Sequence, residues 1–285
     1  MTLIDRVEEE GNTLAGIRKL IRERTGFDLG LDKNYLIEGR LASMLSAYGC
    51  ESYDSLAHTI DSDPLAYSDF VERITTHETL FFRDESLYTA LAAQIIPEWL
   101  NRSQTGRLSI WSAGCSTGQE PYSILMILQK AFPQVFERTD MRGTDISSVT
   151  IARAKQGIFT SHAIGRGLSE DFLSRFFRVT DTQYQVNAEL RAKVDFEVHN
   201  LQDLPYRGQY DIIFCRNVLI YFDHPLRRLV LEGFRKCLKP NGVLVLGSAE
   251  SVQGYVDNYI IRECGLARYY EFNAPNVTIF PRSAG

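Results

Sequence analysis

The chain has 285 residues, 44% of them apolar and 24% charged, with a formal net charge of −5, a composition that suits one large α/β domain or a small domain beside a medium one. No apolar run approaches the roughly 18–20 residues needed to cross a bilayer, and the acidic start MTLIDRVEEEGNT differs from a signal peptide, so we expect a cytoplasmic protein without membrane insertion. The five cysteines and five histidines form no CxxC, HxH or HxxxH pattern, so no metal site is expected.

Residues 1–76 are predicted to form a separate all-α domain. Apolar residues follow helical spacing, and Asp63-Pro64 supplies an N-cap and a first-turn proline. Helices are expected at 13–27, 31–49, 52–60 and 64–74. This segment has 8 Lys and Arg residues against 14 Asp and Glu residues. Nucleic-acid binding needs a basic surface, so the acidic excess argues against a nucleic-acid partner.

From Leu108 onward, strand patterns alternate with helix patterns, which predicts a doubly wound α/β sheet. The first strand runs into a loop bracketed by Gly114 and Gly118, and Pro121 is expected to open the following helix. Strands are expected at 108–111, 141–145, 194–201, 210–221, 242–250 and 267–272, the last of them at a sheet edge. Residues 158–193 are irregular and are predicted to be an insert with a small hairpin near 184–186.

Polar side chains gather at the carboxyl ends of these strands, which share one edge of a parallel sheet. They belong to the glycine loop up to Glu120, to Asp145 and Asn200, and to the segment from Arg216 to Tyr221. A carboxylate after the second strand can accept bonds from both ribose hydroxyls. Asp145 could instead cap a helix, and Asn200 could be a turn residue. The loop matches neither GxGxxG nor GxxxxGK[ST], so a nucleoside without pyrophosphate, such as S-adenosylmethionine, is the expected ligand.

Several segments together resemble the CheR family of chemotaxis methyltransferases over about residues 14–272. They are ITTHETLFFRD (74–84), WSAGCSTGQEPYSI (111–124), GTDIS (143–147), NL (200–201) and FCRNVLIYFD (214–223). The resemblance implies an all-α N-terminal domain over 1–76 that is a candidate for docking the substrate, and a linker helix region over 77–107 that contributes to the cofactor site. It also implies a Rossmann-like class I methyltransferase domain over 108–285, with helices on both sheet faces and a small antiparallel β-subdomain inserted at about 158–193.

The resemblance further implies a protein-glutamate O-methyltransferase. Such an enzyme transfers the methyl group of S-adenosylmethionine to glutamate carboxylates of chemoreceptor cytoplasmic helices and leaves S-adenosylhomocysteine. By motif, the catalytic residues are Arg83 and Tyr221, and the cofactor-binding residues are His77, Thr79, Arg83, Gly114, Glu120, Asp145, Asn200, Leu201, Arg216 and Asn217. A surface salt bridge for Arg83 and a core position for Tyr221 are the alternatives.

Two positions depart from the family pattern. His77 stands where Asn is common, and the second helix keeps only Arg40, with Lys33 upstream, where the family is usually arginine-rich. Fewer positive charges predict weaker steering of an acidic receptor helix. A monomer is expected. The sequence leaves open whether a receptor C-terminal peptide binds the insert. Two other functions remain: a methyltransferase of this fold with another acceptor, and a non-catalytic module that senses S-adenosylmethionine.

Overall fold

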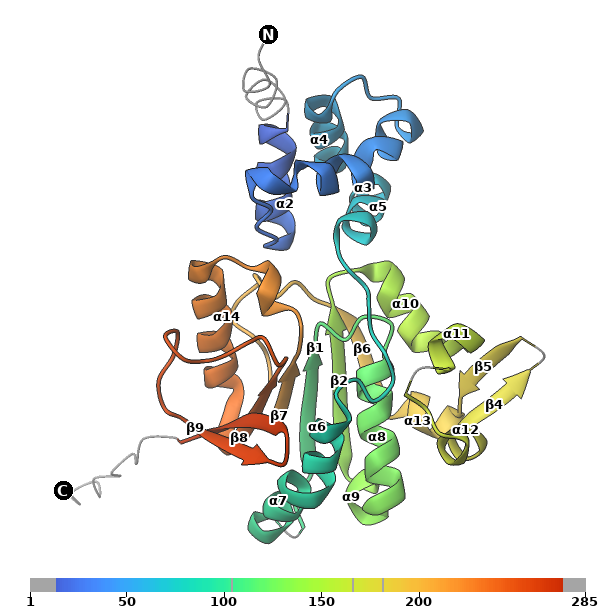
Figure 1. Ribbon diagram of the computed structural model, residues 1–285, viewed down its shortest axis with the longest axis vertical. Helices are drawn as coiled ribbons and strands as arrows, with labels where there is room; N and C mark the ends of the chain where they lie inside the picture. Colours follow the sequence, from blue (N-terminus) through green and yellow to red (C-terminus); the bar gives the residue numbers. More distant parts are fainter. Residues whose placement is uncertain (1–13, 104, 166, 181, 274–285) are drawn as a thin grey trace, which may run out of the picture.

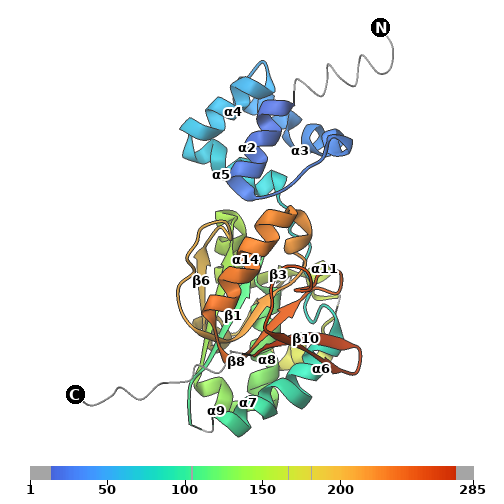
Figure 2. The ribbon, with the colours of Figure 1, turned by 90° about the vertical axis from the view of Figure 1, so that its left-hand side faces the viewer.

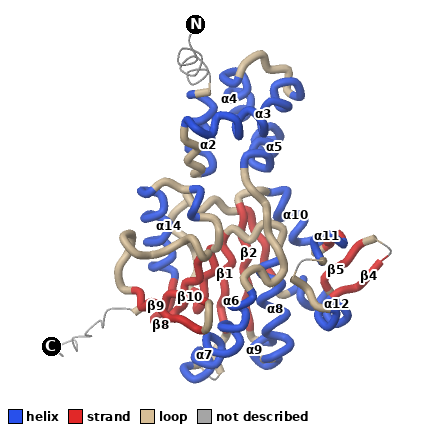
Figure 3. Tube along the Cα trace, in the orientation of Figure 1, coloured by secondary structure: helices blue, strands red, loops and turns tan. Residues whose placement is uncertain are grey.

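The computed structural model describes residues 14–273 except 104, 166 and 181. Its N-terminal part is entirely helical and lies at one end of the molecule, beyond the carboxyl edge of the sheet (Figures 1 and 3). The elements are α2 (Ala15–Thr25), the short 3-10 helix η1 (Leu31–Lys33), α3 (Asn34–Ala47), α4 (Tyr53–Ser62) and α5 (Pro64–Ile74). The four predicted helices are therefore confirmed.

Local chemistry accounts for the ends of these helices. The side chain of Asp63 accepts a hydrogen bond from the backbone N–H of Leu65, and Pro64 occupies the first turn of α5. At the other end of the domain, α2 stops at Gly26, whose φ of 77° is left-handed. The segment after α5 leads into α6 (Glu85–Ala90), the π-helical turn η2 (Leu91–Ile95) and α7 (Ile96–Arg102).

The second part of the chain is built on a seven-stranded sheet with the order β6-β2-β1-β7-β8-β10-β9. The strands are β1 (Leu108–Ala113), β2 (Thr139–Asp145), β6 (Val194–Val198), β7 (Tyr210–Cys215), β8 (Leu238–Leu246), β9 (Tyr259–Cys264) and β10 (Ala267–Phe272). The pairs from β6 to β8 are parallel, whereas β10 runs antiparallel to both β8 and β9. The carboxyl ends of the parallel strands consequently share one edge.

Helices cover both faces of this sheet, because alternate residues of each strand enter different cores (Figure 2). Ile110 of β1 and Phe214 of β7 belong to the core that includes α8. Trp111 points the other way, and its ring lies 5.3 Å from that of Phe234 in α14. The helices flanking the sheet are α8 (Gln119–Ala131), α9 (Pro133–Glu137), α10 (Ser148–Gln156) and α14 (His224–Cys237).

The insert is a small antiparallel sheet with its own helices. It contains β3 (Ile158–Thr160), β4 (Phe177–Thr180) and β5 (Gln183–Val186) in the order β3-β5-β4, with α11 (Ser161–Ile164), α12 (Glu170–Phe176) and α13 (Ala188–Ala192). The ring of Phe81, which precedes α6, packs edge-on against Phe159 and Phe177 of the insert. The predicted hairpin is confirmed, and the insert supports the segment that enters α6.

Several sequence predictions about element ends are wrong, among them the strand expected over 194–201, which ends at Val198. The strand expected over 210–221 ends at Cys215, and residues 219–221 form the 3-10 helix η3 (Leu219–Tyr221). Asn217 has a φ of 58°, which no regular strand accommodates. The helix after the glycine loop begins at Gln119 rather than at Pro121, and β8 begins at Leu238, directly after α14.

The strand over 267–272 is also misplaced at the sheet edge. It is β10, which pairs on both sides, and the missed strand β9 forms the edge. The side chains of β9 are mostly exposed, so its sequence lacks the apolar alternation of a half-buried strand. Within the described ranges, no helix is long and apolar enough to span a bilayer.

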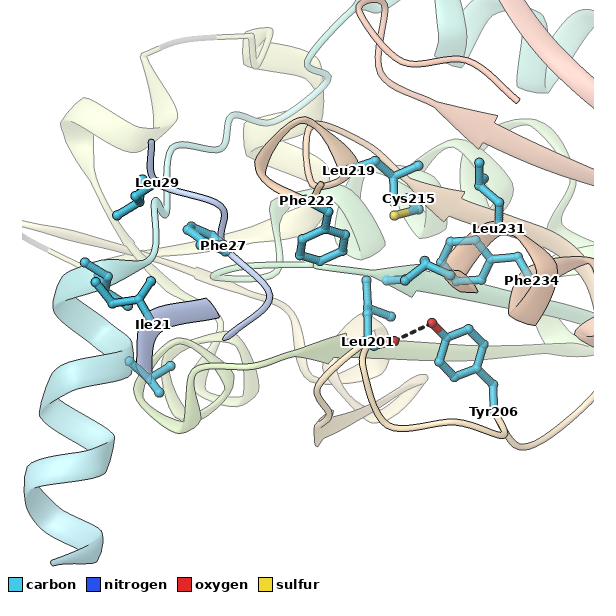
Figure 4. Packing of buried hydrophobic residues seen from close by; sticks show 14 of the residues in the cluster. Ile21, Phe27, Leu29, Leu201, Tyr206, Cys215, Leu219, Phe222, Leu231 and Phe234 are labelled. Carbon is cyan, nitrogen blue, oxygen red and sulfur yellow. Dashed lines mark hydrogen bonds between the residues drawn. The ribbon is translucent and has the colours of Figure 1, made fainter. Parts of the chain in front are cut away.

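The two parts of the molecule share a continuous apolar core. Phe27 follows α2 and faces Phe222, and the core continues through Leu219 to Leu231 and Phe234 (Figure 4). Arg22 forms an ion pair with Asp223, and Asn200 Nδ2 donates to the carbonyl oxygen of Arg24 at 2.9 Å. The end of α2 is therefore packed directly on the loops at the carboxyl edge of the sheet.

Gly26 allows this close packing, and its substitution by alanine should weaken it. A Cβ there would lie 2.6 Å from Leu226 Cδ2 and would also have to adopt a left-handed φ. We expect Gly26→Ala to lower the free energy of unfolding by about 1–3 kcal/mol, measured by denaturant titration.

Gly39 in the middle of α3 is the matched control, because a Cβ there meets nothing within 4 Å. Gly39→Ala should raise the free energy of unfolding by roughly 0.5–1 kcal/mol through helix propensity. Unchanged stability of Gly26→Ala would contradict this account of the packing.

Candidate functional site

Every residue predicted for the site lines one cavity at the carboxyl edge of the sheet. The space between its walls, open solvent included, is about 1060 Å³. The lining includes His77, Thr79, Arg83, Gly114, Glu120, Asp145, Asn200, Leu201, Arg216, Asn217 and Tyr221. Further lining residues come from the N-terminal domain, among them Thr25 and Phe27.

The loop after β1 is held by the end of β2. The backbone N–H groups of Gly114 and Cys115 both donate to the carbonyl oxygen of Thr144, at 2.7 and 2.8 Å. Gly114 has a φ of 78°, and a Cβ there would lie 2.4 Å from Val218 Cγ2. Glycine is required here because the backbone turns left-handed directly against the loop after β7.

Asp145 is buried at the end of β2, and its carboxylate organises the turn around it. Oδ2 accepts a hydrogen bond from the N–H of Ser116 at 2.8 Å, and Oδ1 accepts from the N–H of Ser147 at 3.0 Å. The N-cap of α10 is Ser147 rather than Asp145, so the helix-cap alternative for Asp145 is wrong. Burial raises the pKa of the Asp145 carboxyl, and the bonds from Ser147 and Ser116 partly offset this.

Glu120 lies in the first turn of α8, where its carboxylate bridges two strand ends. Oε1 accepts from Ser112 Oγ at 2.7 Å, and Oε2 accepts from Arg216 Nη1 at 3.0 Å. Its side chain is only 12% exposed. Each oxygen can accept a further bond, so Glu120 can bind a cationic group of a ligand in the cavity.

Arg216 is a deeply buried charge of the site, with its side chain 4% exposed. Besides Glu120, it forms an ion pair with Asp84, and its Nη2 donates to the backbone oxygen of Arg83 at 2.8 Å. Burial lowers the pKa of the guanidinium, but Glu120 and Asp84 outweigh it and leave the pKa above its usual value. The N–H groups of the guanidinium therefore mainly hold Glu120, Asp84 and the Arg83 backbone in place.

The segment that carries His77, Thr79 and Arg83 crosses the cavity between α5 and α6. His77 Nε2 lies 3.2 Å from Glu72 Oε2, and the carbonyl oxygen of His77 accepts from Ser116 Oγ at 3.3 Å. Arg83 Nη1 donates to the carbonyl oxygen of Glu78 at 3.1 Å. Within the described residues Arg83 forms no ion pair, so the salt-bridge alternative for Arg83 is not met there.

Tyr221 meets the N-terminal domain at the cavity wall. Its ring stacks on that of Phe27 with centroids 4.6 Å apart and planes 7° from parallel. The N–H of Asp28 donates to the carbonyl oxygen of Tyr221 at 2.9 Å. Tyr221 is half-buried in η3 rather than placed in the core of a strand, so the alternative of a core aromatic does not hold.

Asn200 combines a place in the cavity wall with two structural bonds. Its Oδ1 accepts from the N–H of Gln202 at 3.1 Å, which is the expected turn geometry, while Nδ2 reaches Arg24 of the N-terminal domain. The turn alternative for Asn200 is therefore met, and Asn200 lines the cavity as well.

Sequence reasoning missed three residues that shape the site. Phe27 stacks on Tyr221, Asp84 pairs with Arg216, and His199 lines the cavity beside Asn200. Burial, with Arg142 nearby, lowers the pKa of the His199 imidazole. Asp84 directly follows Arg83 in the quoted FFRD segment and could have been singled out there, whereas Phe27 lies far away in the sequence.

Arg40 has a structural role in addition to its charge. Its guanidinium donates to the carbonyl oxygen of Ile74 and to Thr76 Oγ1, and so ties α3 to the segment that enters the cavity. This bonding leaves less of the only arginine on the second helix available to a partner.

Comparison with known proteins gives one family over most of the chain. The family model described as "CheR methyltransferase, SAM binding domain" matches residues 77–266, and "CheR methyltransferase, all-alpha domain" matches residues 12–75. The chain is 35% identical to chemotaxis protein methyltransferase Cher2 of Pseudomonas putida over 89% of this chain and 95% of that protein. It is 34% identical to chemotaxis protein methyltransferase 1 of Pseudomonas aeruginosa, over 87% and 93%.

Among solved structures, the chain resembles magnesium protoporphyrin IX methyltransferase from Synechocystis PCC 6803 with bound S-adenosylmethionine. The identity is 16% and the TM-score 0.36, over 76% of this chain and 96% of that chain.

The raised pKa of Asp145 predicts a pH dependence of cofactor binding. A protonated carboxyl accepts ribose hydroxyls less well, so affinity for S-adenosylhomocysteine should fall as the pH drops through the Asp145 pKa, which lies above the ordinary value of about 3.9. Asp145→Asn should weaken binding at neutral pH by about 10–100-fold and remove this acid limb. Isothermal titration calorimetry over a pH series measures both effects.

Asp140→Asn is the matched control, because Asp140 lies at the opposite end of β2 and is paired with Arg107 on the surface. The affinity of Asp140→Asn for S-adenosylhomocysteine should depend on pH in the same way as that of the unsubstituted chain. Since His77 lowers the Asp145 pKa, a His77→Asn series separates that contribution. Unweakened binding by Asp145→Asn would exclude this carboxylate from the site.

Proposed function

Because the chain belongs to the CheR methyltransferase family and carries its S-adenosylmethionine-binding domain, we propose that it methylates glutamate side chains of chemoreceptor cytoplasmic helices in the cytoplasm. The single observation that carries the proposal is the meeting of Arg83 and Tyr221 at the cavity that also contains Glu120 and Asp145. The product would be a glutamyl methyl ester, with S-adenosylhomocysteine released.

Each group of the cofactor has a chemically suited partner in the cavity. Asp145 binds the ribose hydroxyls, because a carboxylate has about four acceptor positions and those of Asp145 are not all taken by Ser116, Ser147 and Thr150. Glu120 binds the ammonium of the methionine end, supported by its bond to Ser112. Gly114 brings the backbone close to the ligand. Asn200, Leu201 and Asn217 complete the wall around the nucleoside, with His77 and Thr79 bordering it.

The reaction is a displacement at the methyl carbon. A glutamate oxygen attacks opposite the sulfur, the new O–C bond forms as the C–S bond breaks, and the electron pair of that bond stays on sulfur. A glutamate is already ionised near neutral pH, so no general base is needed. Since an anion and a sulfonium combine to neutral groups, excluding water from both assists the step, and alignment is the other main requirement.

Arg83 and Tyr221 provide that alignment. Arg83 is partly exposed at the cavity, and one of its N–H groups is fixed by Glu78. Its remaining N–H groups can hold the incoming carboxylate in a planar arrangement. Tyr221, kept in place by Phe27, can donate its hydroxyl to the same carboxylate. Too strong a bond would blunt the nucleophile, so positioning is the main contribution of both residues.

Two surfaces of the molecule are suited to binding a receptor, one on the N-terminal domain and one on the small sheet. The helical N-terminal domain lies beyond the carboxyl edge of the sheet (Figure 1), and its residues Thr25 and Phe27 line the cavity. Its acidic excess suits docking of a receptor helix better than of a polyanion. In the small sheet β5 is central, so β3 and β4 leave edges on which an extended receptor peptide could add a strand. We propose a monomer as the working unit.

Removing the Arg83 guanidinium should abolish most turnover while the fold persists. We expect Arg83→Ala to lower kcat by roughly 100-fold or more, as loss of a transition-state donor does elsewhere, with S-adenosylhomocysteine binding largely retained. Arg268, which pairs with Glu263 on the surface, is the matched control, and Arg268→Ala should keep full activity. Full activity of Arg83→Ala would rule out the assignment of this residue.

The chemical bond between the transferred methyl group and its acceptor shows which kind of group is methylated. Incubation with methyl-labelled S-adenosylmethionine and receptor-containing membranes should label a receptor-sized band, and mild alkali should release the label as methanol because esters hydrolyse under these conditions. Alkali-stable label would mean another acceptor chemistry. Cofactor binding without transfer to any acceptor would favour a sensing module.

A further inference from the structure

The loop between β7 and α14 is held by one acidic side chain from outside the cavity. Glu250 follows β8, and its Oε2 accepts the backbone N–H of Asn217 at 2.9 Å. Its Oε1 accepts the N–H of Val218 at 2.9 Å and that of Ile220 at 3.3 Å. One carboxylate thus accepts three backbone hydrogen bonds from the stretch that leads to Tyr221.

The turn that carries Glu250 is fixed against the same loop. Glu250 Oε2 also accepts the N–H of Gly247 at 2.7 Å, and the N–H of Glu250 donates to the carbonyl oxygen of Gly247 at 2.9 Å. A Cβ on Gly247 would lie only 2.9 Å from the backbone nitrogen of Asn217. The end of β8 therefore packs closely on the loop and aims the carboxylate at it.

The loop needs such support because its backbone is in an unfavourable conformation. Asn217 has a φ of 58°, a left-handed value that asparagine tolerates better than most residues but does not prefer. The loop departs from the ladder at Cys215, so its N–H groups require other acceptors. Glu250 provides these acceptors, and they fix the direction in which Tyr221 enters the cavity.

We infer that Glu250 is a positioning residue for methyl transfer, which acts by fixing the 216–221 loop and thereby Tyr221. The inference rests on the proposed function of Tyr221. Glu250 is not part of the cavity wall, whereas Asn217 and Tyr221 are. Because Glu250 bonds the backbone of Asn217 as well as the stretch before Tyr221, its loss should lower turnover more than it lowers cofactor affinity.

Glu250→Gln tests this with little change in volume. The amide keeps one acceptor oxygen and places an NH₂ group against backbone donors, so either the Asn217 side or the Val218 side of the clamp is lost. We expect kcat to fall by about 100-fold, the scale of a misplacement of about 1 Å at a reacting group, and S-adenosylhomocysteine affinity to fall by less, through the displaced Asn217. Amide hydrogen exchange of the 216–222 stretch should become faster, which is measurable without an acceptor.

A double-mutant cycle with Tyr221→Phe distinguishes positioning from a general structural role. If Glu250 acts through Tyr221, Glu250→Gln should cost far less in the Tyr221→Phe background than alone. An equal loss in both backgrounds, or unchanged kcat with slow exchange in Glu250→Gln, would overturn the inference. Glu263→Gln is the control, because Glu263 pairs with Arg268 on the surface, and it should be silent.

Glu250→Asp keeps both oxygens on a shorter side chain and should recover part of the turnover. It also provides the test if Glu250→Gln does not fold. Failure of the proposed function can be told apart from failure of this inference alone. If the proposed function is wrong, the unsubstituted chain transfers no methyl group to a glutamate, and the inference fails as well. Transfer by the unsubstituted chain with both Glu250 variants fully active would overturn the inference alone.

Discussion

The buried guanidinium of Arg216 joins the three segments from which the cavity is made. It belongs to the loop after β7 and bonds Glu120 in the first turn of α8. It also bonds the backbone of Arg83 and the carboxylate of Asp84 in the segment before α6. Loss of one partner of a buried ion pair typically costs about 3–5 kcal/mol. Two carboxylates compensate the one buried cation, so the network remains charged and rigid.

The same segments carry backbone strain that this network stabilises. Phe82 and Asp84 have left-handed φ values of 52° and 63°, and Ser116 has one of 50°. Such conformations persist only where surrounding bonds over-determine them. Here the Arg216 bond to the Arg83 backbone lies between Phe82 and Asp84, and Asp145 holds the N–H of Ser116. The geometry of the candidate site is therefore held by bonds within the chain itself.

The N-terminal domain forms part of the cavity wall. Phe27 covers the ring of Tyr221, and Asn200 reaches Arg24, so movement of the helical domain would alter the cavity wall. The helical domain and the wall of the cavity are thereby coupled through the Phe27–Tyr221 stack and the Asn200–Arg24 hydrogen bond. Under the proposed function, a partner bound to the helical domain would act on the orientation of Tyr221 through these contacts.

The sequence alone determined the class of fold and the cavity residues at the strand ends, because both depend on local patterns, whereas His77, Thr79 and Arg83 came from the resemblance to the CheR family. Helical spacing defined the first domain, and motifs at parallel strand ends met in one cavity since such ends share an edge. Only the tertiary structure decided that β9 is the edge, that the strand from Tyr210 stops at Cys215, and that Phe27 and Glu250 support Tyr221. These features depend on contacts between residues distant in sequence, and the periodicity of a single segment carries no information about its partners.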